Sequence, residues 1–248
     1  MAHYFASDVH LRLDHPERGC RFVQFVSKLE PNDSLTIVGD LCDFWMGSRS
    51  TEQELLRCDG LEALVAFRDR GGALDIMAGN HDLWLMPFYE RSLGARILEQ
   101  PHDLSIDGLK VRLVHGHLLG ARAPWKAILE SRAFFEGFGL IPAPLARRLD
   151  ELLARKNSKE LLADEERHLT VYRAYARSLE NQADLVIFGH VHRPVDESSS
   201  SPRLVVLGGW QRGTSFLKID PSGVTFSVQP EKTAIKIPPT SETTGRIP

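Results

Sequence analysis

The segment ALDIMAGNHD, residues 73–82, joins an apolar run of strand length to three side chains that can do chemistry. Gly79 lets the backbone turn as it leaves the strand, and Asn80, His81 and Asp82 follow directly. Taken alone, the segment also fits an ordinary turn, because Gly and Asn tolerate positive φ and Asp caps helices. The choice between a turn and a functional site depends on whether other predicted strands are followed by the same types of side chain.

Four other apolar runs also lead into carboxylate or imidazole side chains. They end in Asp8-Val9-His10, Gly39-Asp40-Leu41-Cys42-Asp43, His115-Gly116-His117 and Gly189-His190-Val191-His192. Side chains two residues apart in an extended segment point the same way, so Asp8 and His10 can share one target. The carboxyl ends of strands in an open α/β sheet line the ligand crevice. We therefore expect all five clusters to meet at one place.

The ligand types in these clusters indicate divalent metal ions. Carboxylates, imidazoles and one amide oxygen, without thiolates, suit Mn²⁺, Fe²⁺ or Zn²⁺. Their number exceeds the needs of one ion and matches the needs of two. Each cluster also has a simpler explanation, as a hydrogen-bonded structural histidine, a Gly-Asp turn or a helix cap. The metal site is favoured because the simpler explanation must apply five times, always at the same end of a strand.

The order of apolar segments predicts an α/β (α+β) fold. Strands at residues 3–7, 34–39 and 73–79 alternate with helices at 16–29 and 52–70, as in a layered fold with helices over a sheet. From about residue 104 the strands are joined by short turns, and Asp107-Gly108 is a typical hairpin turn. The expected result is a pair of sheets with helices outside.

A long helical insertion separates His117 from the strand that begins near Asp184. It contains four aromatic side chains that either pack on the core or form a cap over the site. These are Trp125, Phe134, Phe135 and Phe138. We predict a single domain over residues 1–229 with a cap insertion at about 120–180. Residues 230–248 are polar and rich in Pro and Thr, and we expect them to be a disordered tail.

The composition excludes several classes of protein. A formal net charge of −3 gives no general attraction to nucleic acid. Three irregularly spaced cysteines argue against a disulfide framework and for a reducing compartment. No signal peptide and no apolar run of membrane-spanning length is present. The sequence predicts a cytoplasmic protein, with peripheral contact to the inner membrane left open.

In order and spacing, the motifs D-x-H, G-D-x-x-D, G-N-H-D, H-G-H and G-H-x-H resemble the calcineurin-like metallophosphoesterase family. The resemblance implies a four-layer fold of two packed mixed β-sheets flanked by helices, with a two-metal centre at the sheet edge. It implies His81 as the catalytic histidine, Asp82 as its orienting partner, and Asp43 as a support outside the ligand set. The implied ligands are Asp8, His10, Asp40 and His192 for one ion, and Asp40, Asn80, His115 and His190 for the other.

A closer resemblance is to the UDP-2,3-diacylglucosamine pyrophosphatase branch of that family. It rests on the helical insertion and on RKNSKE (155–160), FGHVHRP (188–194) and VVLGGW (205–210). In that branch the insertion caps the site and shelters acyl chains of a lipid A precursor. At the position of Glu165 the branch has a lysine. The carboxylate of Glu165 would repel a phosphate that a lysine would hold. The implied substrate contacts are Asn80, His81, Arg155, Ser158 and His190.

The predicted reaction is hydrolysis of a phosphoester or pyrophosphate by a hydroxide that bridges two divalent ions, with Mn²⁺ expected. His81 would stabilise developing charge or protonate the leaving oxygen. The nearest alternative is a phosphoesterase of the same fold acting on another nucleotide or lipid pyrophosphate, and a nuclease is less favoured. A non-catalytic metal-binding scaffold is the alternative of another class. Arg12 and Arg122 are either phosphate contacts or solvated surface charges.

Overall fold

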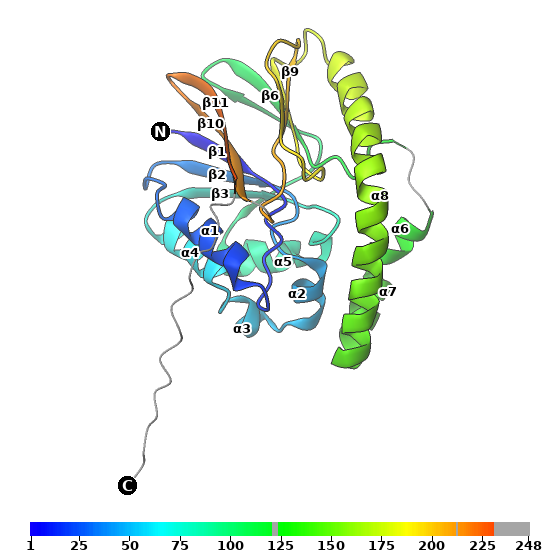
Figure 1. Ribbon diagram of the computed structural model, residues 1–248. Helices are drawn as coiled ribbons and strands as arrows, with labels where there is room; N and C mark the ends of the chain where they lie inside the picture. The colour runs from blue at the N-terminus through cyan, green and yellow to red at the C-terminus, as the bar shows by residue number, and fades with distance from the viewer. Residues whose placement is uncertain (121–123, 212, 231–248) are drawn as a thin grey trace.

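The computed structural model describes residues 1–120, 124–211 and 213–230 (Figure 1). The side chains of residues 18, 124–126, 150, 151 and 153–164 are outside this description. The predicted tail at 231–248 lies outside the described residues, as does Arg122. The tail and the phosphate contact of Arg122 therefore stay predictions.

Two mixed sheets form the centre of the molecule, as the sequence predicts. The first has the order β11-β10-β1-β2-β3-β4. In it β1 to β4 pair in parallel, β10 pairs antiparallel with β1, and β11 pairs antiparallel with β10. The second has the order β5-β6-β7-β9-β8, with β6, β7 and β9 parallel. The strands are β1 (His3–Ala6), β2 (Ser34–Val38), β3 (Ala73–Met77), β4 (Arg96–Leu98), β5 (His102–Ile106), β6 (Leu109–Val114), β7 (Leu185–Phe188), β8 (Val195–Glu197), β9 (Arg203–Val206), β10 (Gly213–Asp220) and β11 (Gly223–Pro230).

Helices cover the outer faces of both sheets (Figure 1). They are α1 (Pro16–Val26), α2 (Phe44–Arg49), α3 (Glu52–Leu55), α4 (Asp59–Asp69), α5 (Met86–Phe88), α6 (Pro124–Leu129), α7 (Arg132–Leu140) and α8 (Ala143–Arg177). A 3₁₀ turn, η1 (Leu83–Leu85), and a π-helical turn, η2 (Tyr89–Leu93), flank α5. The helix predicted over 52–70 is interrupted after Leu56, and Thr51 begins its first piece with a capping box.

Three hydrophobic cores separate the layers. One lies between the first sheet and α1 and α4, and includes Phe22 and Phe67. A second lies between the two sheets, where Phe5 and Val38 face Leu113. A third joins the second sheet to α8. The strands β2 and β7 are buried along their whole length, which explains why each reads as a continuous apolar run instead of an alternating one. The four-layer fold expected from the sequence is confirmed.

The insertion consists of α6, α7 and α8. The helix α8 has 35 residues in one continuous element. Its later part packs on the second sheet through Leu169, Tyr172 and Ala176. Its earlier part extends past the sheet beside α6 and α7 (Figure 1). Within the described residues, no helix combines the length and the hydropathy needed to cross a membrane.

Candidate metal centre

The side chains of interest follow the carboxyl ends of β1, β2, β3, β6 and β7. The loops after β1 and β2 run side by side, because the Asp8 amide donates to the Gly39 carbonyl at 3.0 Å and the His10 amide to the Asp40 carbonyl at 3.1 Å. The amide of Trp210 donates to the Asp8 carbonyl from the segment after β9. Backbone hydrogen bonds between three distant segments therefore fix the backbone positions of the residues that carry these side chains.

Four of the predicted ligands have left-handed backbone conformations. Their φ angles are 51° at Asp8, 50° at His10, 56° at Asp40 and 64° at His190. Such angles are uncommon for residues other than glycine, and they cluster at functional sites, where surrounding structure maintains the strain. Only two other non-glycine residues in the described parts of the chain share them. The unusual backbone conformations therefore occur at the predicted ligands and not only at the glycines beside them.

Two motif glycines are required because neighbouring side chains occupy the space of a Cβ. A Cβ on Gly39 would overlap the ring of His115, and Gly39 also has a φ of +86°. A Cβ on Gly79 would overlap the carboxylate of Asp40. These glycines allow side chains from other strands to approach the backbone closely.

The first metal group consists of Asp8, His10 and His192, whose ligand atoms all lie within 4.8 Å of one another. The Nε2 atoms of His10 and His192 are 3.2 Å apart. Asp8 Oδ1 lies 3.8 Å from the first of these nitrogens and 3.6 Å from the second. The His192 side chain is 29% exposed, so this group opens toward solvent.

The second metal group consists of Asp40, His115 and His190. Nδ1 of His115 is 2.8 Å from the carbonyl oxygen of Val38. A carbonyl only accepts, so Nδ1 carries a proton and Nε2 is the ring nitrogen that faces the site. That nitrogen lies 3.5 Å from Asp40 Oδ2 and 3.4 Å from Asn80 Oδ1. The His115 side chain is fully buried, so this group is the more enclosed one.

Asp40 connects the two groups. Its carboxylate is 3.5 Å from His115 and 3.8 Å from His10, and its Oδ1 accepts a hydrogen bond from the His81 amide at 2.9 Å. Burial alone would raise the pKa of Asp40, but the imidazoles of His115 and His81 hold that pKa well below its usual range. Burial lowers the pKa of His115, yet Asp40 raises it to about 9.

The donor set fits cations at this position. Asp8 Oδ1 is buried and has no hydrogen-bond partner among the described residues. A buried charged oxygen without compensation is unfavourable, and a cation between Asp8 and the two nearby imidazoles would compensate it. Carboxylate oxygens and imidazole nitrogens are suitable ligands for Mn²⁺, Fe²⁺ and Zn²⁺. The residues present therefore fit a dinuclear centre.

Comparisons with known proteins agree with this chemistry. The model of the family "Calcineurin-like phosphoesterase" matches residues 3–194. The chain belongs to the calcineurin-like phosphoesterase family. It is 30% identical over 244 residues to the UDP-2,3-diacylglucosamine hydrolase of Nitrosococcus oceani, covering 92% of this chain and 94% of that protein. It is 28% identical to the protein of the same name from Hahella chejuensis, covering 88% and 93%.

Among solved structures, an archaeal phosphodiesterase aligns with a TM-score of 0.44 and 16% identity, over 92% of this chain and 99% of that one. The family membership predicted from the five motifs is confirmed by the family match. The chain is a metal-dependent phosphoesterase, a hydrolase that acts on phosphoesters.

His81 of this phosphoesterase lies beside the first metal group. Its ring centroid is 4.7 Å from that of His10, and the two rings are nearly perpendicular. One ring nitrogen of His81 lies within 4.8 Å of the candidate ligand atoms of His10 and Asp40. Its Nδ1 is buried and has no hydrogen-bond partner in the described parts of the chain. The position suits either a ligand or a group that faces substrate, so the catalytic assignment remains a prediction.

In the described parts of the chain, the hydrogen bonds of the Asp82 carboxylate go to groups other than the His81 ring, so the orienting role expected from the family resemblance stays a prediction. Its carboxylate accepts hydrogen bonds from the amides of Gly79 at 2.9 Å and Leu41 at 2.8 Å, and from the Tyr89 hydroxyl at 3.2 Å. Burial and the nearby charge of Asp40 raise its pKa to about 6. Asp82 therefore holds the turn after β3 against the loop after β2.

The other predicted site residues have mixed outcomes. Asp43 caps α2 by accepting from the Trp45 amide, and its carboxylate lies 3.9 Å from His10 Nδ1, which fits a support outside the ligand set. Arg12 pairs with Asp14 at 2.9 Å and with Asp43 at 3.5 Å, so it is neither a free surface charge nor solely a phosphate contact. Arg155 and Ser158 lie on α8, but their side chains are outside the described residues.

Two residues near the site were not predicted. Gln100 bridges two motif segments, since its Oε1 accepts from the His115 amide at 3.1 Å and its Nε2 donates to the Ala78 carbonyl at 3.3 Å. His168 on α8 brings its ring to 5.2 Å from that of His190. Gln100 stands just before a proline in a loop, and His168 lies in a charged helical run. Neither position has a local motif, so only the tertiary fold reveals them.

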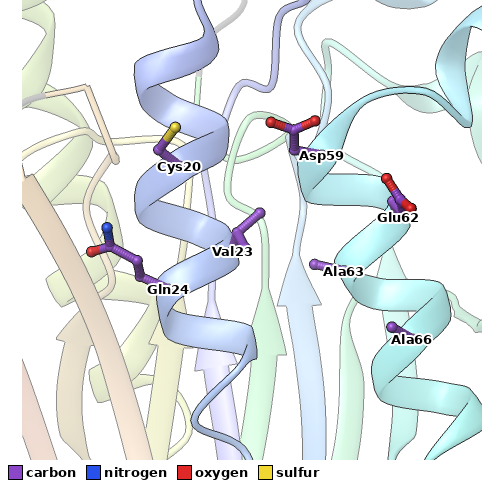
Figure 2. Close-up of a pocket in the computed structure, with 7 residues that line it drawn as sticks. All are labelled: Cys20, Val23, Gln24, Asp59, Glu62, Ala63 and Ala66. Carbon is purple, nitrogen blue, oxygen red and sulfur yellow. The ribbon is translucent and has the colours of Figure 1, made fainter. Parts of the chain in front are cut away.

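A groove elsewhere on the surface is not part of this centre. It lies between α1 and α4, and Cys20, Asp59 and Glu62 are among its lining residues (Figure 2). None of the residues that line it belongs to a metal group. The chemistry of this phosphoesterase is therefore located at the strand ends and not in this groove.

Proposed function

We propose that this phosphoesterase hydrolyses the pyrophosphate bond of UDP-2,3-diacylglucosamine, releasing UMP and 2,3-diacylglucosamine 1-phosphate. The observation that carries the phosphoryl chemistry is the position of Asp40 between two groups of imidazole and carboxylate ligands. The sugar-nucleotide substrate is supported by relatives named UDP-2,3-diacylglucosamine hydrolase, which align with about nine tenths of the chain. A role in lipid A biosynthesis belongs to the same proposal.

The proposed ligands divide between two divalent ions that share Asp40, with Mn²⁺ as the expected ion and Fe²⁺ or Zn²⁺ as alternatives. Two such ions supply an activated water and neutralise charge on the phosphoryl oxygens. Asp8, His10 and His192 hold the first ion. Asn80, His115 and His190 hold the second. Val38 supports the second set by fixing the orientation of the His115 ring.

His81 is the proposed catalytic residue. This proposal is supported by the hydrogen bond from the His81 amide to Asp40, which holds the backbone of His81 next to the two metal groups. From there its imidazole donates a proton to the leaving oxygen or a hydrogen bond to the phosphoryl oxygens. Asp82 maintains the turn that carries it. Asn80, His190, Arg155 and Ser158 are the further proposed substrate contacts.

The insertion is proposed to shelter the acyl chains. Phe44 of α2 packs against Phe134, Phe135 and Phe138 of α7, with ring centroids 5.3–5.7 Å apart. Large apolar side chains also remain exposed on α6, α7 and α8, where they suit a lipid substrate or peripheral contact with the inner membrane. They are Ile128, Leu140, Leu145 and Leu152. A cytoplasmic location is proposed, and Cys20, Cys42 and Cys58 are all free thiols.

The test is release of UMP from the acylated UDP-sugar by the Mn²⁺-loaded full chain. The proposal expects turnover of this substrate to exceed turnover of UDP-N-acetylglucosamine, which lacks the acyl chains. Hydrolysis of bis(para-nitrophenyl) phosphate, without any UMP release from the acylated substrate, would contradict the substrate. That result would favour a related phosphoesterase that acts on another nucleotide or lipid pyrophosphate. Absence of metal-dependent hydrolysis with every phosphoester would favour a metal-binding scaffold.

A further inference from the structure

The helix α8 is fixed firmly against the strand ends of the second sheet. Tyr172 stacks on Phe188 with ring centroids 4.3 Å apart and an interplanar angle of 5°, and Gly116 has no room for a Cβ because the Tyr172 hydroxyl fills that space. Two ion pairs tie the helix to the loop after β7 and to β8. They are Glu166–Arg193 at 2.6 Å and Arg173–Glu197 at 2.7 Å.

This docking places the ring of His168, one turn before Tyr172, against the second metal group. It lies 5.2 Å from the His190 ring at an interplanar angle of 86°. The buried His117 also lies near this group, with its ring centroid 5.1 Å from that of His115 and 6.2 Å from that of His190. His168 is only half-buried and belongs to neither metal group. His168 therefore adds an imidazole beside His190 that is not one of the candidate ligands of either metal group.

The same helix also carries a carboxylate near His168, that of Glu165. Glu165 and His168 are three residues apart, on one face of the helix. A carboxylate repels a phosphate, whereas an imidazole N–H can donate a hydrogen bond to one, so His168 is the side chain of this pair that suits a second phosphate of the substrate.

We propose that His168 contacts the non-reacting phosphate of a diphosphate diester and selects it over a simple phosphodiester. This inference deepens the proposed function and rests on the two-metal phosphoesterase centre, but it does not require the sugar or the acyl chains. His168 is a binding residue in this account, and the reacting phosphate remains at the metal ions. A positioning role through His190 alone would act equally on both kinds of ester.

The test compares two inhibitors of bis(para-nitrophenyl) phosphate hydrolysis by the Mn²⁺-loaded full chain. They are diphenyl phosphate and diphenyl diphosphate, the latter with one phenyl ester on each phosphorus. The readout is the ratio of their inhibition constants. His168→Phe keeps an aromatic ring against His190 but has no N–H donor, and we expect it to reduce the preference for the diphosphate about tenfold. His168→Gln restores a donor and is expected to recover most of that preference.

Thr170→Ala is the matched control, because this exposed side chain on α8 donates only to the carbonyl of Glu166 one turn earlier. It should keep the wild-type ratio. An unchanged ratio in His168→Phe would overturn the inference, as would equal weakening of both inhibitors or loss of bound Mn²⁺. If the ratio falls as expected while UDP-2,3-diacylglucosamine is not cleaved, the proposed substrate fails and this inference stands.

Discussion

The metal centre and the helical insertion are built in opposite ways. In the centre, Asp8, Asp40 and His115 are almost fully buried, and strained backbone holds several ligands in place. In the insertion, α6 and α7 expose large apolar side chains such as Ile128 at 64% and Leu140 at 86%. Reaction chemistry needs fixed ligand geometry, whereas a surface for a flexible lipid-like group needs apolar area. The contrast separates the candidate metal ligands from the insertion that we propose to contact the substrate.

The largest effect should follow Asp40→Asn. Asparagine keeps the shape, the acceptor for the His81 amide and a tolerance for the left-handed backbone, but it removes the charge shared by the two metal groups. We expect turnover of any phosphoester to fall about 10³-fold or more. Elemental analysis should show fewer than two ions per chain. Asp107→Asn is the control, because it makes the same change at another left-handed position, in the β5–β6 turn.

His81→Ala should separate catalysis from metal binding. We expect turnover to fall about 100-fold or more, as for loss of a general acid. Bound metal should stay at the wild-type level. His102→Ala, a change on β5 outside the metal groups, should leave both quantities unaltered. If His81→Ala loses an ion, His81 is a ligand and the proposed catalytic role is wrong.

Two histidine substitutions should distinguish the enclosed group from the open one. His115→Ala removes a ligand and also leaves the buried Val38 carbonyl without its donor, so the free energy of unfolding should fall by about 1–3 kcal/mol in the metal-free protein. His192→Ala removes a ligand from a side chain that is 29% exposed, and metal-free stability should change much less. Denaturant unfolding with and without Mn²⁺ measures both. Equal losses in the metal-free state would contradict the contrast.

Phe138→Ala should affect the insertion more than the centre. Phe138 is buried against Phe44, Trp45 and Phe134, so truncation should destabilise the packing of α7 on α2 by about 3 kcal/mol. We expect faster hydrogen exchange in α7 and a higher KM for an acylated substrate, with bound metal unchanged. Leu140→Ala, two residues away and highly exposed, is the control. Loss of metal in Phe138→Ala would show that the two regions are not separate.

The sequence predicts the centre better than its surroundings. Asp8, Asp40 and His190 are predictable because each follows an apolar strand within a short motif, and parallel strands bring their carboxyl ends to one edge. The Asp82 contacts were not predictable, since its partners Leu41 and Tyr89 come from other segments.

The insertion shows the same limit on a larger scale. Its helical character is visible in the pattern, but nothing local indicates that α8 continues unbroken for 35 residues or that His168 reaches His190. Those features depend on how Tyr172 packs on Phe188, a contact made between segments distant in the sequence. Short motifs thus fix the ligands, while tertiary packing decides which other side chains join them.

The most direct test is a crystal of the full chain grown with Mn²⁺ and examined by anomalous scattering. The account predicts two peaks about 3.5–4 Å apart, one on each side of the Asp40 carboxylate. Asp8, His10 and His192 should surround the first peak, and Asn80, His115 and His190 the second. A single peak, or two ions that do not share Asp40, would contradict the account.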